Sequence, residues 1–466
     1  MGSVELAVVG AGPAGLSAAI TAARSGLRTA LLDEYPRPGG QYLKGASEPD
    51  AAPPISAAER QGRTLLRQLA ETDLELRTQT LVWGIERASE GWRLALHGPR
   101  GLDWLEARAV VVAAGARELV VPFPGWTLPG VMTLGAAQIL AKAHGVLPGR
   151  RVLLAGSGPL LLAAAAELTR RGARVTAVLE AVPLSRWLRH APAIWGNWDR
   201  LGEGRHYLAE LWRSGTPYRP GWTVAEALGG DELEAVIVAR LDRRGHPIPS
   251  SREQVPADSL CMGFGFIPNV ELTQLAGCAH VFDPARGGWV PGVDERLETS
   301  LPGLFVAGEA AGVAGAAAAM LEGHIAGMAA AYRLGRLPEG QLARELAARA
   351  GRRRRLGRFA AMLNTLFAPA PGLDALITDD TPICRCEEVS AGEVRAAIRG
   401  GATELDALKT WMRVGQGACQ GRTCGPLLAR LVAVETGRPV GQAGCFGVRP
   451  PLKPIPLGDL AQEGAS

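Results

Sequence analysis

The N-terminus carries the pattern that most constrains the fold of this chain. An apolar stretch, 4–9, runs into Gly10-Ala11-Gly12-Pro13-Ala14-Gly15, and an alanine-rich stretch and a second apolar stretch follow. This order predicts a strand, a glycine turn, a helix and a second strand, the fingerprint of a dinucleotide-binding α/β unit. In such a unit Gly10 allows the tight turn, Gly12 lets the backbone approach a pyrophosphate, and Gly15 lets the helix pack closely on the sheet.

Acidic residues end the second predicted strand. Asp33 follows Gly15 by 18 residues, which places its carboxylate to accept a hydrogen bond from a ribose hydroxyl, and Glu34 is the alternative acid. An acid at this point repels a 2′-phosphate, so adenosine without that phosphate is favoured. Gly40 and Gln41 come just after the strand, where we expect the backbone to run close to a cofactor. A glycine turn without a ligand is the alternative interpretation.

A second cassette of the same kind spans 151–180 and forms an internal repeat with the first. It has Gly156-Ser157-Gly158 at the turn and Glu180 at the end of the following strand, but Leu161 stands where the third glycine belongs. Leu161 is expected to push the helix off the sheet or to crowd the pyrophosphate. We therefore do not expect NAD(H) turnover here, and favour a vestigial or differently occupied pocket. NADP is disfavoured further because no basic residue directly follows Glu180.

Composition and charge exclude several classes of protein. With 47% hydrophobic residues the chain can bury a sizeable core, and its formal net charge of +4 is too balanced to indicate nucleic-acid binding. Glu322 and His324 interrupt an alanine-rich run, and no segment reaches the ~18 uncharged apolar residues of a membrane span. The basic run 352–355 lies in a helix-like stretch without interleaved aromatics, which favours a solvated helix face or a partner contact. We expect a cytoplasmic protein.

Four of the seven cysteines form one C-terminal pattern, C-x-C followed after 32 residues by C-x4-C: Cys384, Cys386, Cys419 and Cys424. The intervening segment reads as two short helices. At this chain length the pattern indicates a metal site in a reducing compartment rather than a disulfide framework. Zinc sites favour C-x2-C spacing, whereas four cysteines can equally hold a [2Fe–2S] cluster. We prefer the cluster, with zinc and free thiols as alternatives.

Two further segments carry a resemblance to a known family. Ala114 and Gly115 follow a predicted strand, and Gly308 and Glu309 lie where a strand turns into a long helix. With the first cassette they resemble the two-dinucleotide-binding-domain flavoproteins over about residues 1–335, although that family has Asp where this chain has Glu309. The resemblance implies an α/β fold with two Rossmann-like domains of the pyridine nucleotide-disulfide reductase type. It also implies FAD bound by residues of these segments, namely Gly10, Gly12, Pro13, Ala14, Gly15, Asp33, Glu34, Gly40, Gln41, Ala114, Gly115, Gly308 and Glu309.

The cysteine module resembles the bacterioferritin-associated-ferredoxin-like [2Fe–2S] domain, a small helical domain, and Cys445 falls outside its pattern. We therefore predict an FAD-binding domain over 1–117 and 256–335, a second dinucleotide-binding-like domain over 118–255, a linker over 336–381, a [2Fe–2S] domain over 382–450 and a Pro-rich tail over 451–466. The alternating residues 222–265 are expected to form a small sheet, and the tail to lie extended along a surface.

The combination of modules resembles the cluster-bearing subunits of heteromeric amine dehydrogenases. These include the opine oxidase A subunit, the hydrogen cyanide synthase B subunit, and the alpha subunit of proline or D-hydroxyproline dehydrogenase. The resemblance implies oxidation of the C–N bond of an amino acid or secondary amine and transfer of electrons to a quinone or another acceptor. It implies a smaller FAD-containing subunit that holds the substrate, with room for a further small subunit, and an FMN can lie between the subunits of such complexes. Peripheral association with the inner membrane would then run through the partner or the acceptor.

No substrate-binding or catalytic constellation is legible in the sequence. His144, His190 and His324 are scattered, Cys261 and Cys278 read as core thiols, and no CxxC pair indicates a disulfide reductase. We nominate no catalytic residue. The alternative function is a stand-alone NADH-dependent reductase that feeds electrons to a ferredoxin-like carrier.

Overall fold

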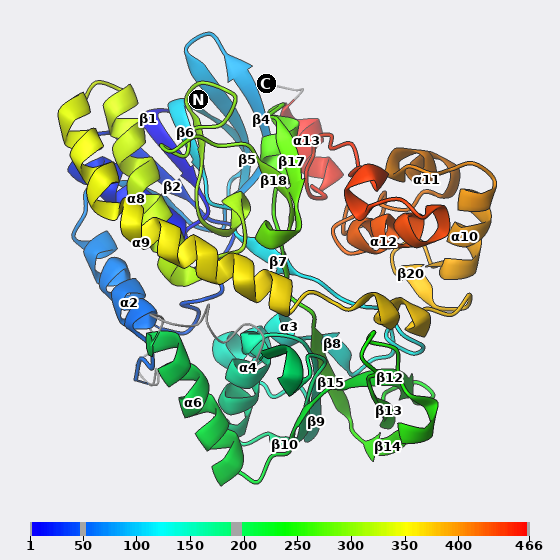
Figure 1. Cartoon of the computed structure of the whole chain (residues 1–466). Coiled ribbons are helices and arrows are strands. Elements are labelled where there is room, and N and C mark those ends of the chain that lie inside the picture. Colours follow the sequence, from blue (N-terminus) through cyan, green and yellow to red (C-terminus); the bar gives the residue numbers. More distant parts are fainter. Residues whose placement is uncertain (1, 47–52, 188–197, 464–466) are drawn as a thin grey trace. The chain divides into compact units, whose positions relative to one another are not determined.

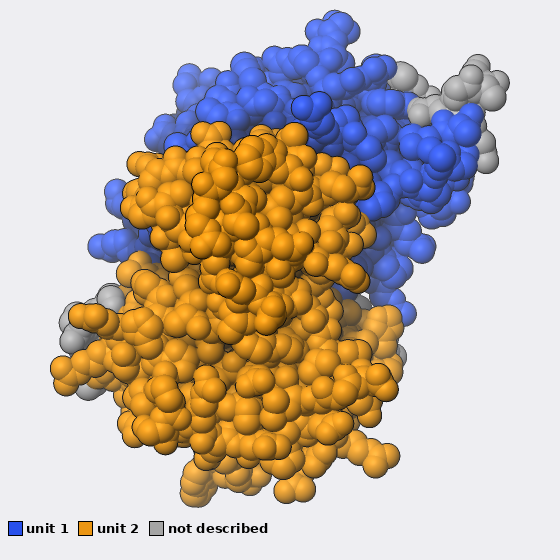
Figure 2. Space-filling model, turned by 90° about the vertical axis from the view of Figure 1, so that its right-hand side faces the viewer, with its two compact units in different colours: residues 1–117, 267–361, 448–466 blue, residues 118–266, 362–447 orange. Residues whose placement is uncertain are grey.

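The computed structural model describes residues 2–46, 53–187 and 198–463. The chain forms two compact units, coloured separately in Figure 2, each assembled from segments far apart in the sequence. Unit 1 comprises residues 1–117, 267–361 and 448–466, and unit 2 comprises residues 118–266 and 362–447. The chain passes between the segments of the two units in β7 (Ala116–Glu118), in β16 (Phe266–Pro268), near the end of helix α9 and after residue 447.

Unit 1 is built on a seven-stranded sheet of order β3-β2-β1-β6-β5-β4, with β19 paired to β6 (Figure 1). The pairs among β3, β2, β1, β6 and β19 are parallel, whereas β4, β5 and β6 form an antiparallel meander. The strands of unit 1 are β1 (Gly2–Val9), β2 (Thr29–Leu32), β3 (Glu75–Arg77), β4 (Leu81–Ala88), β5 (Gly91–Gly98), β6 (Gly101–Val112) and β19 (Leu304–Val306), with a hairpin of β17 (His280–Asp283) and β18 (Gly288–Pro291).

Helices α1 and α8 pack against each other at very short range beside this sheet. A Cβ on Gly323 of α8 would lie 2.0 Å from the carbonyl oxygen of Ala14 in α1, and one on Gly327 would lie 2.6 Å from that of Ala18. Glycine at both positions therefore lets the two backbones touch. The helices of unit 1 are α1 (Pro13–Arg24), α2 (Ala57–Ala70), α7 (Glu271–Leu275), α8 (Ala316–Arg333), most of α9 (Glu339–Leu366) and α13 (Leu457–Glu463), with 3-10 turns η2 (Pro284–Arg286) and η3 (Gly308–Ala311).

Unit 2 contains a second parallel sheet, of order β11-β10-β9-β15-β8, and a three-stranded antiparallel sheet β12-β13-β14. The prediction for residues 222–265 was wrong for β15, which joins the parallel sheet between β9 and β8 instead of the small sheet. All five residues of β15 are buried, as expected for a strand covered on both faces. The elements are β8 (Val131–Thr133), α3 (Leu134–His144), β9 (Arg151–Gly156), α4 (Pro159–Arg170), β10 (Arg174–Glu180), α6 (Trp198–Arg213), β11 (Tyr218–Pro220), β12 (Trp222–Leu228), β13 (Ala235–Arg240), η1 (Pro249–Ser251), β14 (Glu253–Pro256) and β15 (Ser259–Gly263).

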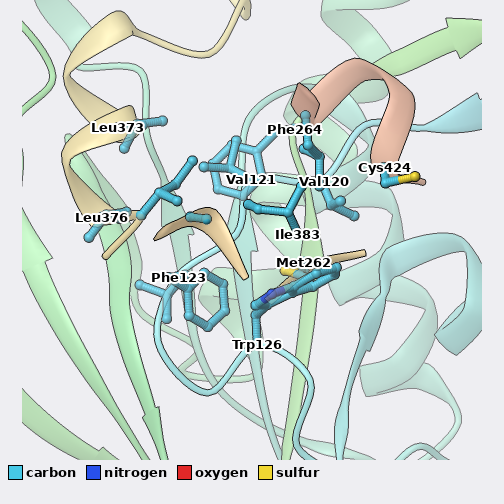
Figure 3. Packing of buried hydrophobic residues seen from close by; sticks show 14 of the residues in the cluster. Val120, Val121, Phe123, Trp126, Met262, Phe264, Leu373, Leu376, Ile383 and Cys424 are labelled. Atoms are coloured by element: carbon cyan, nitrogen blue, oxygen red, sulfur yellow. The ribbon is translucent and has the colours of Figure 1, made fainter. Parts of the chain in front are cut away.

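The cysteine-bearing segment belongs to the same unit and shares its core. Figure 3 shows side chains of Phe123 and Trp126 gathered with Leu376, Ile383 and Cys424, all members of one buried cluster. The Trp126 indole also donates a hydrogen bond of 2.8 Å to the carbonyl oxygen of Pro382. The segment contains η4 (Pro371–Leu376), β20 (Pro382–Cys384), β21 (Val389–Ser390), α10 (Ala391–Arg399), α11 (Leu405–Met412), α12 (Cys424–Thr436) and η5 (Val440–Ala443), so the two helices expected between the cysteine pairs are confirmed.

Two segments differ from simple connectors. Residues 336–381, predicted to be a linker, contain the 28-residue helix α9, which carries the basic run 352–355. The Pro-rich stretch 449–457 was expected to be extended; its residues 449–456 form neither helix nor strand, and helix α13 begins at residue 457. The tail belongs to unit 1. The backbone N–H of Leu452 donates to Trp83, and Lys453 forms an ion pair with Glu34. In the described parts of the chain, no helix combines the length and the apolar composition needed to cross a membrane.

The contact between α1 and α8 makes a prediction about stability. Replacing Gly323 with Ala forces a Cβ against the backbone of α1, and we expect a loss of roughly 2–4 kcal/mol of unfolding free energy. Gly351→Ala in α9 is the matched control, because its Cβ meets nothing within 4 Å and alanine favours a helix; we expect stabilisation of up to about 1 kcal/mol. Urea unfolding followed by circular dichroism measures both, and equal stabilities would contradict the close packing.

Candidate cofactor sites

The first glycine turn, between β1 and α1, requires glycine at two positions. A Cβ on Gly10 would lie 2.4 Å from the carbonyl oxygen of Ala113, and one on Gly15 would lie 1.7 Å from that of Gly10. Gly12 is different, because the nearest atom to its Cβ position is Gly40 Cα at 3.9 Å, so this side of the turn is open. No side chain caps α1 at Gly12, which leaves the N–H groups of the helix N-terminus for a ligand. The cradle fits a pyrophosphate.

Asp33 lies at the end of β2 and is bonded to the glycine turn itself. Its carboxylate accepts hydrogen bonds from the backbone N–H groups of Ala11 at 2.6 Å and Tyr35 at 2.8 Å. An ionised carboxylate has about four acceptor positions, so Asp33 retains capacity for a ribose hydroxyl. Burial raises the pKa of Asp33, and the Lys44 ammonium opposes this shift. Lys44 also lies 4.0 Å above the centre of the Tyr35 ring, and neither Lys44 nor Tyr35 was singled out from the sequence.

The structure separates the other early candidates. Glu34, the alternative acid, is exposed and ion-paired with Lys453 of the tail. Gly40 reaches the turn, since a Cβ on it would lie 2.8 Å from Gly12 Cα, and the preceding Gly39 donates a backbone hydrogen bond of 2.7 Å to Ala11. Gln41 forms a side-chain hydrogen bond with Tyr35.

Ala114 and Gly115 follow β6. Because β6 runs parallel to β1, they lie at the same edge of the sheet as the glycine turn that follows β1. The Asn269 side chain donates to the carbonyl oxygen of Ala114 at 2.9 Å, and its backbone N–H donates to that of Gly115 at 3.0 Å. Arg117 holds Asn269 in turn, with 3.0 Å between Nη1 and the amide oxygen, and pairs with Glu271 at 2.8 Å. The loop after β6 is therefore held in place by Asn269 and Arg117, neither of which was predicted from the sequence.

Gly308 and Glu309 reach the same helix N-terminus from β19. A Cβ on Gly308 would lie 2.7 Å from the Cβ of Ala14, so this glycine too permits close approach. Glu322 of α8 accepts a hydrogen bond of 3.0 Å from the Gly308 N–H, a role missed in the sequence although Glu322 stood out there as a charge in an alanine-rich run. Burial raises the pKa of both Glu309 and Glu322. In unit 1 the structure thus brings most of the predicted FAD contacts together around the N-terminus of α1, and the donor set fits FAD.

The four C-terminal thiols also converge. Cys384 ends β20 and Cys424 begins α12, both buried, while Cys386 is exposed and Cys419 is partly exposed. Hydrogen bonds link the side chains of Cys424 and Cys384, of Cys424 and Cys419, and of Cys386 and Cys419. A Cβ on Gly417 would lie 2.2 Å from the Cβ of Cys386. Position 417 must therefore be glycine for the backbone there to pass this close to Cys386.

The surroundings of the thiols favour thiolates at two of them. Donation from the Cys424 thiol lowers the pKa of Cys384 to about 6 and that of Cys419 to about 4, and backbone N–H groups add to both effects. As the shared donor, Cys424 has a raised pKa. Within the described ranges no three His, Cys, Asp or Glu side chains are grouped for a single metal ion. Four cysteine side chains with neighbouring backbone donors fit a [2Fe–2S] cluster, in which two cysteine sulfurs would bind each of the two irons.

The other residues considered from the sequence do not form a site. His324 shares a 3.0 Å hydrogen bond with Thr21, His144 is exposed at the end of α3, and His190 lies outside the described residues. Cys261 and Cys278 are buried free thiols, and burial raises the pKa of Cys261 to about 12.

Two sheets, each with parallel strands that lead into a glycine turn, occur on one chain with a four-cysteine module. Together they define a class: an oxidoreductase with two dinucleotide-binding folds and a [2Fe–2S]-type domain. The family model for pyridine nucleotide-disulphide oxidoreductases matches residues 4–331, and that for the BFD-like [2Fe-2S] binding domain matches residues 382–433.

Curated relatives narrow the class to a family. The chain is 36% identical to the opine oxidase A subunit of Rhizobium meliloti over 97% of both chains. It is 34% identical to hydrogen cyanide synthase subunit HcnB of Pseudomonas aeruginosa over 98% of both. The L-proline dehydrogenase structure from P. horikoshii shares the fold, with a TM-score of 0.70 at 22% identity, covering 98% of this chain and 79% of that one. The chain belongs to the family that contains HcnB and the opine oxidase A subunit. The resemblance that its motifs indicated to the cluster-bearing subunits of amine dehydrogenases is thereby confirmed.

The open side of Gly12 allows a sharp test of the FAD cradle. Its φ of −74° suits any residue, and a Cβ on it would meet no atom nearer than Gly40 Cα at 3.9 Å, so we expect Gly12→Val to fold. The valine would occupy the space of the pyrophosphate, and we expect at least a tenfold loss of bound FAD, measured from the absorbance of the purified protein. A variant that keeps its full FAD content would show that FAD is not held by this turn.

The cysteine site makes a separate prediction. Cys424→Ser should remove about two irons and two sulfides per chain while FAD stays bound, because the two donor sets share no residue. Cys445→Ser is the matched control and should keep both. Iron, zinc and acid-labile sulfide are measured on anaerobically purified protein, and stoichiometric zinc without sulfide would contradict the assignment.

Proposed function

We propose that this chain is the electron-transferring subunit of a heteromeric dehydrogenase that oxidises the C–N bond of an amino acid or secondary amine, such as an opine, proline, D-hydroxyproline or glycine. In this proposal the first glycine turn and Asp33 hold FAD, and Cys384, Cys386, Cys419 and Cys424 hold a [2Fe–2S] cluster. The observation that carries it is the presence of a dinucleotide cradle and a four-thiol site on one chain.

The two groups do complementary chemistry. When bound, a flavin accepts two electrons as a hydride, whereas a [2Fe–2S] cluster carries one electron at a time. A chain that binds both suits the transfer of electron pairs from a substrate to a one-electron acceptor or a quinone. The residues of this chain orient the dinucleotide through Gly12 and Asp33 and hold the cluster as thiolates. We place the complex in the cytoplasm, with any membrane quinone reached through the partner or the acceptor.

The proposal assigns the substrate to another polypeptide. An amino-acid carboxylate is usually held by an Arg in a bidentate geometry. Arginines near the predicted FAD contacts are engaged within the protein: Arg117 pairs with Glu271, and Arg286 donates to the carbonyl oxygen of Ala311. The relatives are themselves named as subunits. We therefore infer a smaller, FAD-containing subunit that holds the amine, with room for a further small subunit and for an FMN between the subunits.

The cysteine site has one outward edge. Cys386 is exposed and Cys419 partly exposed, whereas Cys384 and Cys424 are buried within unit 2. Cys386 and Cys419 would hold the solvent-facing side of a bound cluster, and we propose that an external one-electron acceptor would approach the chain at these two residues.

The proposal is tested by separating the chain from its partner. The purified single chain should not reduce a dye with proline, hydroxyproline, an opine or glycine, and co-expression with the smaller FAD-containing subunit should restore dye reduction with one of them. Flavin extraction from the complex reports whether FMN accompanies FAD. Amine-dependent turnover by the single chain would show that the substrate site is here. Bleaching of its flavin by NADH alone would favour the stand-alone reductase.

A further inference from the structure

The second glycine turn is in contact with a segment from much later in the chain. Within unit 2, the Ser157 hydroxyl donates a buried hydrogen bond of 2.8 Å to the carbonyl oxygen of Phe367. A Cβ on Gly158 would lie 3.8 Å from the Phe367 ring. Phe367 itself is almost fully buried, at 6% exposure. The residue therefore lies against the side of the turn that a pyrophosphate would face.

The internal repeat supplies the comparison. Gly12 and Gly158 hold the same position in the two cassettes, but their Cβ positions face different neighbours. That of Gly12 lies 3.9 Å from the Cα of Gly40, and that of Gly158 lies 3.8 Å from the Phe367 ring. The backbones also differ, with a φ of −74° at Gly12 and +108° at Gly158. Leu161, fully buried in place of the third glycine, accompanies this altered turn. The second turn therefore differs from the first in its backbone conformation, in its third glycine position and in the aromatic ring that lies against it.

The polar groups of the second turn are also occupied by the protein. Glu180, the counterpart of Asp33, accepts hydrogen bonds from the N–H groups of Gly158 at 3.1 Å and Val182 at 3.0 Å. In the first cassette the Asp33 carboxylate instead accepts from the N–H of Ala11, one residue earlier in the turn. The N–H of Gly12 does not take part in that hydrogen bond. Because Glu180 takes the Gly158 N–H, the turn lacks a donor that a pyrophosphate oxygen would need.

Two further residues hold the late segment in place. The Trp187 ring packs edge-on against Phe367, with 5.0 Å between ring centres, and Arg186 donates a hydrogen bond of 2.9 Å to the carbonyl oxygen of Thr365. The segment 365–367 is thus held by Trp187 and Arg186, and its Phe367 carbonyl oxygen accepts the hydrogen bond from the glycine turn.

We propose that residues 365–367 are an internal plug that occupies the dinucleotide position of the second cassette, so that this half of the molecule holds a part of its own chain where the fold family holds a nicotinamide nucleotide. The plug comprises the last residues of helix α9 and the residue that follows it. The former nucleotide site therefore anchors the chain that leads into the [2Fe–2S] domain. This inference does not rest on the amine substrate or on the partner.

Coverage of the turn is tested first, without any nucleotide. Ser157→Cys places a thiol under the plug, and peptide mass spectrometry after treatment with iodoacetamide reports its reactivity in the full chain. We expect slow alkylation in the single variant and at least a tenfold faster reaction when Phe367→Ala is added. Rapid alkylation of Ser157→Cys with Phe367 in place would overturn the proposal.

Nucleotide binding is tested next, by isothermal titration of the holoprotein with NADH. The wild type should show no saturable binding of NADH up to about 1 mM. The double variant Phe367→Ala/Leu161→Ala should bind NADH with a Kd at least tenfold below that limit, about 0.1 mM or lower. Phe123→Ala is the matched control, because it removes another buried ring of unit 2 outside this turn and should create no binding. Micromolar binding of NADH to the wild type, or no gain in a double variant that retains iron and FAD, would overturn the proposal.

Discussion

The whole of unit 1 depends on direct backbone contact around the first turn of α1. Gly15 allows α1 to begin against the carbonyl of Gly10, and Gly323 allows α8 to lie against the carbonyl of Ala14, where any side chain would collide with the backbone. These contacts fix the distances between β1, α1 and α8, and they leave one open side, at Gly12. Because these contacts fix the position of the helix N-terminus, its N–H groups are held in place for a pyrophosphate.

Sequence alone predicted the parts of the molecule that are encoded locally. The first cassette, with Asp33 at the end of β2, and the four cysteines could be found because each motif combines fixed spacing with residues that have a definite physical role. The glutamate at 322 was noticed as a charge in an alanine-rich run, but its bond to Gly308 links α8 to the segment after β19 and has no signature in local spacing. The same limit explains β15, whose short apolar stretch fits either sheet until its neighbours β9 and β8 are known.

The joining of the cysteine segment to unit 2 was beyond the reach of sequence for the same reason. Composition indicated a linker over 336–381, yet that stretch contains α9 and ends in residues that share a core with Phe123 and Trp126 (Figure 3). The Trp126 hydrogen bond to Pro382 spans 256 positions, and that of Ser157 to Phe367 spans 210. Contacts of this separation follow from the assembled fold and not from periodicity, so a composition shift could not reveal them.

The two cassettes show how similar motifs acquire different roles through small differences. Both have a strand, a glycine turn, a helix and an acid at the end of the next strand, but the acids bond to different N–H groups, Ala11 in one and Gly158 in the other. The first arrangement leaves Gly12 open, whereas the second contains a leucine at the third glycine position and a phenylalanine against the turn. In our proposal, the segment 365–367 takes the place of a nicotinamide nucleotide at the second turn. Electrons for a bound flavin and cluster would then come from a substrate held by a partner subunit, which is the physical reason why such a chain would work as one part of a larger dehydrogenase.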